Sequence, residues 1–133
     1  MKILAFSAFW LVFWLSFSFA GELPDGPEGR YCGFVYNAGY LVRSEVVIGK
    51  TKDGRLIGKM TYRDGDEVTE GTIEEVIKKQ GRERTVKWND KYGTGLAILK
   101  FDEKFDEFEG LWGTDLNIPQ YEWTGKRCND VTS

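Results

Sequence analysis

The chain contains two cysteines, Cys32 and Cys128, and no histidine. Without histidine, the Ser-His-Asp and Cys-His arrangements of nucleophilic catalysis are excluded, as are zinc, copper and haem sites that use histidine ligands. The two cysteines form no CxxC pair, so a metal site built on them is not expected. An even pair of cysteines in an exported protein indicates a structural disulfide. We therefore expect a Cys32–Cys128 bridge, no metal and no cofactor.

Carboxylates are the next candidates for chemistry. One acidic run comprises Asp102, Glu103, Asp106, Glu107 and Glu109. Paired carboxylates can hydrolyse glycosides or hold Ca²⁺, but this run does not match an EF-hand loop, and a solvated hairpin tip is the favoured interpretation. The same holds for residues 64–67. The glycine-rich residues 90–95 lack the phosphate-loop pattern and precede no helix, so we expect them to connect two strands.

The best candidates for ligand binding are aromatic side chains on predicted strands, namely Tyr62, Trp88, Trp112 and Trp123. Aromatic walls with few polar groups suit small molecules. The alternative, which we favour for each tryptophan, is that these rings fill a packed core. Arg127 follows Trp123 at strand spacing and is suited either to binding a ligand carboxylate or, as we favour, to a structural cation–π pair.

Residues 1–20 have the pattern of a secretory signal peptide. Lys2 precedes a nearly unbroken apolar run, and the small residues Ser18 and Ala20 mark a cleavage site before Gly21. An anchoring transmembrane helix is the alternative, but the run is slightly short and no basic cluster follows it. Cleavage leaves 113 residues, with 17 Lys and Arg against 21 Asp and Glu. This acidic balance argues against nucleic acid and anionic membrane surfaces as partners.

The strands that must position these residues recur as short β-type runs separated by turn residues, after a flexible lead-in at 21–29. Eight runs are expected in a single domain at 30–133, at residues 30–36, 41–50, 55–63, 68–79, 84–88, 94–101, 106–113 and 121–128. Asp53-Gly54 is a strong two-residue hairpin signal. Residues 72–81 also carry helix signals, with a capping box and apolar residues at i, i+3 and i+4. We favour strand there because the neighbouring segments are β-type.

A pattern of apolar-x-Gly-x-large residues occurs in four of these runs, at residues 31–35, 56–60, 108–112 and 123–127. Glycine weakens a strand, so it is expected where a strand bends or where a large side chain crosses the backbone. These positions favour an all-β, antiparallel up-and-down meander that closes into a small barrel. Closure makes the first and last strands neighbours, which brings the two cysteines together.

The signal peptide, the eight runs in meander order and the terminal Trp-x-Gly-x-Arg resemble the calycin-type barrels, the relatives of lipocalins and avidin. In lipocalins an early Gly-x-Trp packs under a late Arg. Here Gly29-Arg30-Tyr31 has Tyr in place of Trp, and Arg127 is the late partner. The set of biotin-binding residues of avidin has no match, so biotin is not implied. The resemblance implies a carrier or binding protein for apolar ligands.

These observations predict an exported, non-catalytic binding module, secreted or periplasmic, that holds a small apolar ligand or docks on a protein partner. No nucleic acid and no membrane span after signal cleavage are expected. A carboxylate-based hydrolase acting on glycans and a structural envelope component remain as alternatives.

Overall fold

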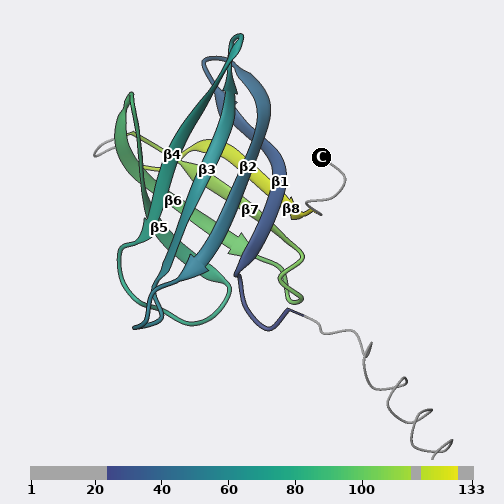
Figure 1. The fold of residues 1–133 in the computed structure, drawn as a ribbon, viewed down its shortest axis with the longest axis vertical. Helices are drawn as coiled ribbons and strands as arrows, with labels where there is room; N and C mark the ends of the chain where they lie inside the picture. The colour runs from purple at the N-terminus through teal and green to yellow at the C-terminus, as the bar shows by residue number, and fades with distance from the viewer. Residues whose placement is uncertain (1–23, 115–117, 129–133) are drawn as a thin grey trace, which may run out of the picture.

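The computed structural model describes residues 24–114 and 118–128. These form eight antiparallel strands in chain order around a closed barrel, with β8 pairing back to β1 (Figure 1). The strands are β1 (Gly29–Asn37), β2 (Tyr40–Lys50), β3 (Leu56–Asp64), β4 (Glu67–Glu75), β5 (Glu83–Asp90), β6 (Gly93–Phe101), β7 (Glu107–Trp112) and β8 (Tyr121–Arg127). The predicted all-β meander barrel is confirmed. The predicted signal peptide lies outside the described residues.

Strand β4 is shorter than predicted. It ends at Glu75, and residues 76–82 are neither helix nor strand. Ile73 and Glu75 alternate into the barrel and are fully buried or nearly so, whereas Ile77 is 67 % exposed. The strand interpretation is therefore right for 72–75 and wrong for 76–79. The helix signals do not prevail because β4 gains ladders with both β3 and β5.

The loop between β2 and β3 also differs from the sequence-based expectation. Gly54 N donates to Thr51 O at 3.0 Å and Thr51 N donates to Arg55 O at 2.8 Å. The hairpin turn expected at residues 51–54 is therefore confirmed, but its loop has three residues, Lys52, Asp53 and Gly54, and not only Asp53-Gly54. Gly54 has a φ of 92°, which suits the left-handed residue that follows a type I turn in such loops.

Glycines of the predicted pattern lie where strands and side chains approach closely. Gly33 on β1 faces Gly125 on β8. A Cβ atom at Gly33 would lie 2.1 Å from the Thr124 carbonyl oxygen, and one at Gly125 would lie 2.4 Å from the Phe108 ring. Only glycine at these two positions allows β1 and β8 to approach each other and the Phe108 ring this closely, so these residues help to close the barrel.

The disulfide joins the two strands that close the barrel. Cys32 lies on β1 and Cys128 directly follows β8, with a Cα–Cα distance of 5.7 Å, and the predicted pairing is confirmed. The bridge spans a sequence separation of 96 residues. A loop of that length restricts the unfolded chain by about 4–5 kcal/mol in the chain-entropy model. Covalent and hydrogen-bonded closure thus stabilise the same seam.

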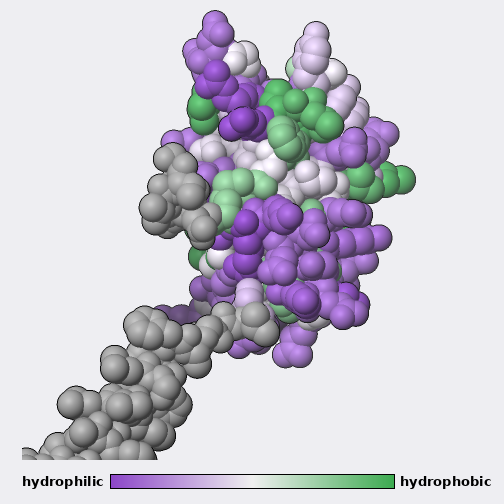
Figure 2. All heavy atoms as spheres, turned by 90° about the vertical axis from the view of Figure 1, so that its right-hand side faces the viewer, coloured by the Kyte–Doolittle hydropathy of each residue, from purple (hydrophilic) through white to green (hydrophobic). Residues whose placement is uncertain are grey.

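The barrel has one end filled by aromatic rings. Ring centroids in this cluster are 5.5 to 5.9 Å apart, and its members are Tyr31, Phe101, Phe105 and Phe108. The N-terminal segment 24–28 lies at this end, at the bottom of Figure 1. The β1–β2, β3–β4 and β5–β6 turns lie at the opposite, open end. Figure 2 shows hydrophobic residues gathered in the upper part of one face, below two projecting loops, and a mainly hydrophilic lower part.

Candidate functional site

Arg127 lies at the filled end of the barrel. Its guanidinium lies over the Tyr31 ring, 5.0 Å from the centroid. It donates to the carbonyl oxygens of Phe105 at 2.5 Å, Glu28 at 2.9 Å and Gly26 at 3.0 Å. Tyr31 Oη donates to Pro27 O at 2.9 Å, and burial raises the pKa of Tyr31 to about 12. The arginine and tyrosine expected from the calycin resemblance therefore do meet, and they tie the N-terminal segment across this end.

The interior above this cluster contains a cavity of about 170 Å³. Six aromatic side chains line it. Five come from strands around the barrel and one, Tyr92, from the β5–β6 turn; the five are Tyr36, Tyr62, Trp88, Trp112 and Trp123. The structure thus brings together the predicted residues Tyr62, Trp88, Trp112 and Trp123. It leaves Arg127 outside the cavity. The barrel is packed solid only at its filled end. Each tryptophan therefore packs on neighbouring side chains on one side, as a core residue would, and faces the cavity on the other side.

Two of the cavity tryptophans are fixed by backbone carbonyls. Trp88 Nε1 donates to Gly113 O at 2.8 Å, and Trp112 Nε1 donates to Tyr36 O at 3.2 Å. The two indoles meet edge to face with centroids 5.6 Å apart. Trp112 also packs on Tyr121 at 5.0 Å. These contacts make a rigid aromatic wall whose donors are already satisfied.

Trp123 differs from the other two. Its side chain is 2 % exposed and lines the cavity. Its Nε1 is buried and has no hydrogen-bond partner in the part of the chain that the structure describes. A buried N–H without a partner costs about 1–3 kcal/mol. Because this nitrogen is itself buried, Trp123 contributes its ring to the cavity wall and not an accessible donor.

A polar group lies at the rim, where β5 ends. Tyr62 Oη donates to Asp90 Oδ2 at 2.7 Å, and Tyr92 N donates to Asp90 Oδ1 at 2.8 Å. Burial, followed by the hydrogen bond to Asp90 and the charge of that carboxylate, raises the pKa of Tyr62 well above its usual value. Residues 90–95 were expected to connect two strands, whereas only Lys91 and Tyr92 do so and Asp90 belongs to β5. Its period-2 spacing after Val86 and Trp88 is the signal that could have found it.

A second carboxylate joins two turns at the open end. Asp64 Oδ2 accepts from Thr69 Oγ1 at 3.0 Å and also from Tyr92 Oη. These bonds, the one from Tyr92 first, lower the pKa of Asp64, and the same bond raises the pKa of Tyr92. The β3–β4 turn is thereby held against the β5–β6 turn, which fixes Tyr92 beside the cavity.

Residues 102–106 of the acidic run form a hairpin tip, as expected, whereas Glu107 and Glu109 lie on β7. Asp102 Oδ1 accepts from the backbone N–H groups of Asp106 at 2.7 Å and Glu107 at 3.2 Å. None of the acidic residues of this run lines the cavity. Asp102 therefore has a structural role, in shaping the β6–β7 turn.

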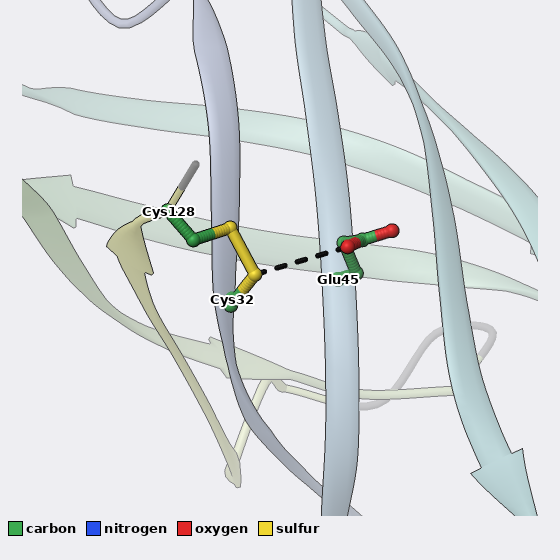
Figure 3. A group of neighbouring side chains, drawn as sticks. All are labelled: Cys32, Glu45 and Cys128. Carbon is green, nitrogen blue, oxygen red and sulfur yellow. Dashed lines mark hydrogen bonds between the residues drawn. A yellow bond between two sulfur atoms is a disulfide. The ribbon is translucent and has the colours of Figure 1, made fainter. Parts of the chain in front are cut away.

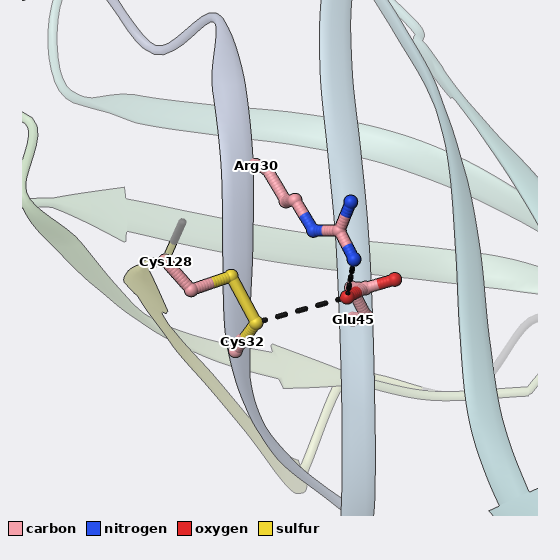
Figure 4. Close-up of a disulfide and its surroundings, with 4 residues drawn as sticks. All are labelled: Arg30, Cys32, Glu45 and Cys128. Atoms are coloured by element: carbon pink, nitrogen blue, oxygen red, sulfur yellow. Dashed lines mark hydrogen bonds and ion pairs between the residues drawn. A yellow bond between two sulfur atoms is a disulfide. The ribbon is translucent and has the colours of Figure 1, made fainter. Parts of the chain in front are cut away.

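Glu45 lies next to the disulfide (Figure 3). One of its oxygens is 3.8 Å from Cys32 Sγ, and the carboxylate, Cys32 and Cys128 are the only group in the described ranges with the donors and spacing of a metal site. Both sulfurs are bonded to each other, so neither is a thiolate. The carboxylate instead pairs with Arg30 Nη2 at 2.5 Å (Figure 4). The group is therefore a disulfide with the Arg30–Glu45 ion pair beside it.

A buried ion pair near the filled end was not foreseen. Arg84 Nη1 lies 3.1 and 3.2 Å from the two oxygens of Glu75, and Glu75 Oε1 also accepts from Leu56 N at 3.0 Å. Glu75 is fully buried and Arg84 is 5 % exposed. The pair joins β3, β4 and β5 and does not face the cavity. It is a structural feature.

No protein-family model, no curated protein sequence and no solved structure matches the chain. Within residues 24–114 and 118–128, no helix is long and apolar enough to cross a membrane. The disulfide is compatible with an extracytoplasmic location.

Proposed function

We propose that this protein is an exported binding protein that holds a small, mainly apolar molecule inside its barrel. The observation that carries the proposal is a cavity of about 170 Å³ whose wall, among the described residues, holds six aromatic side chains and one carboxylate. A wall of rings with few polar groups is typical of ligand sites, and the polar groups set orientation. The chemistry of the lining therefore favours a flat, mainly apolar ligand.

The size of the cavity limits the ligand. A protein cavity of about 150 Å³ is known to hold benzene, and this one measures about 170 Å³. The occupant is accordingly a molecule with one ring and a short substituent, on the order of ten non-hydrogen atoms. Larger lipid-like ligands would have to extend through the open end.

The lining gives little support to a carboxylate-based hydrolase. Glycoside hydrolysis uses two carboxyl groups that flank the bond to be cleaved. Asp90 is the one carboxylate among the described residues that line the cavity. We therefore favour binding without catalysis.

Native mass spectrometry of the protein purified from its own exported compartment tests this proposal. We expect a small additional mass that is lost on denaturation. Trp123→Phe, which removes only the indole N–H and part of the ring, should carry that mass in a smaller fraction. Glu122→Gln changes an exposed neighbour on β8 and should retain it. A wild-type protein that is always bare would contradict the proposal.

A further inference from the structure

The charge of the cavity lining is acidic. Asp90 is the only charged side chain among the described residues that line it. Its two oxygens accept from Tyr62 Oη and Tyr92 N, at 2.7 and 2.8 Å. A carboxylate has about four acceptor positions, so further donors can bind. In the described ranges no lysine or arginine pairs with Asp90, and the nearby Lys91 pairs with Glu67 at 3.7 Å.

The rim around this carboxylate is aromatic. Tyr62 and Tyr92 both contact Asp90, and Trp88 precedes it on the inner face of β5. Ring faces attract cations. Tyr92 already has the ammonium of Lys91 at 5.1 Å from its ring centroid. A negative charge set among rings is suited to an organic cation and unsuited to an anion.

Asp90 lies near the open end of the barrel, above a floor of aromatic rings. Trp123 packs edge to face on Phe108, with centroids 5.8 Å apart, and Phe108 belongs to the filled-end cluster. Trp123 therefore forms the floor. Asp90 is the last residue of β5, next to the β5–β6 turn at the open end. A ligand that reaches both has a cation near the open end and an apolar ring below it.

We propose that the ligand is a small aromatic amine, with its ammonium at Asp90 and its ring against the aromatic side chains of the cavity wall. This inference rests on the proposed binding function and adds the charge and polarity of the ligand. The ammonium of such a molecule donates to the carboxylate in a charge-assisted hydrogen bond. An anion of the same size would meet Asp90 with no basic side chain in the lining to offset the repulsion.

Isothermal titration calorimetry of the purified protein with three small molecules tests the proposal. Tyramine, 4-ethylphenol and 3-(4-hydroxyphenyl)propionate share a phenol ring and differ in charge. We expect tyramine to bind about tenfold or more tightly than 4-ethylphenol. The propionate should bind more weakly than either. Equal affinities, or a preference for the anion, would overturn the inference about charge.

Two variants separate the role of Asp90 from net charge. Asp90→Asn should bring tyramine to within about twofold of 4-ethylphenol while 4-ethylphenol itself is unchanged. Glu103→Gln removes the same charge from an exposed position at the filled end and should leave the tyramine preference intact. If Asp90→Asn does not fold, the preference of the wild-type protein among the three probes still decides the question. If 4-ethylphenol binds as well as tyramine, the charge inference fails and the binding function stands. If no probe binds, the proposed function fails with it.

Discussion

The buried pair of Glu75 and Arg84 makes a sharp prediction about stability. In Glu75→Gln the side chain keeps its shape and an acceptor for Leu56 N, but the guanidinium of Arg84 loses its counter-charge. The Arg84 side chain is 6 % exposed, and its other acceptor among the described residues is the Gly81 carbonyl oxygen, at 3.2 Å from Nε. Removing one partner of a buried pair costs about 3–5 kcal/mol, because the other charge stays buried and uncompensated.

Glu74 offers a matched control on the same strand. Its side chain is 58 % exposed and lies 3.8 Å from Arg55 Nη1, an ion pair at the surface. Glu74→Gln should therefore cost less than about 1 kcal/mol. Both variants remove one negative charge from adjacent positions, so the difference between them reports burial.

Urea unfolding followed by tryptophan fluorescence measures both variants. We expect the midpoint to fall strongly for Glu75→Gln and little for Glu74→Gln, with the same dependence on urea in each case. A double variant, Glu75→Gln with Arg84→Met, should recover part of the lost stability, since no charge is then left buried. Equal losses at positions 74 and 75, or a loss below about 1 kcal/mol at position 75, would refute the reasoning.

Three further outcomes are expected. Gly33→Ala, whose Cβ would lie 2.1 Å from the Thr124 carbonyl oxygen, should lower the free energy of unfolding by roughly 2 kcal/mol or more, whereas Gly49→Ala, with open space around it, should change it little in the same urea assay. Because burial raises the pKa of Tyr31 to about 12, the unfolded chain loses this proton first, so stability should fall as pH rises from about 10 to 12, and Tyr31→Phe should flatten that fall in thermal unfolding scans. Ala38 has a φ of 51°, so Ala38→Asn should raise the melting temperature, and an unchanged or lower value would contradict the turn geometry.

The strand pattern was readable from the sequence because burial in a small barrel follows the alternation of side chains. Val86 and Trp88 on β5, and Ala97, Leu99 and Phe101 on β6, share the inner face as the period-2 spacing predicts. The disulfide was predictable for a related reason, since a closed meander makes its first and last strands neighbours. Local chemistry and topology agree at these positions.

The polar features were harder to predict from the sequence. The alternation of side chains shows which face of a strand a residue occupies, but not which residues of other strands it contacts there. Glu75 follows the same spacing as Ile73, yet its contribution to stability depends on the ion pair with Arg84, which comes from another strand. Asp90 becomes part of the cavity rim only when Tyr62 reaches it from β3. The tryptophans likewise could be placed on inner faces, whereas the volume left between them depends on side-chain packing that no single strand specifies.

Nuclear magnetic resonance of the indole N–H groups tests the central claim most directly. After removal of residues 1–20 the chain has three tryptophans, and all of them line the cavity. On addition of 4-ethylphenol we expect the Nε1–H signals of these tryptophans to shift, because a bound aromatic ring changes the magnetic environment of the indoles around it. A Trp123 signal that stays in place while surface amides shift would contradict binding inside the barrel.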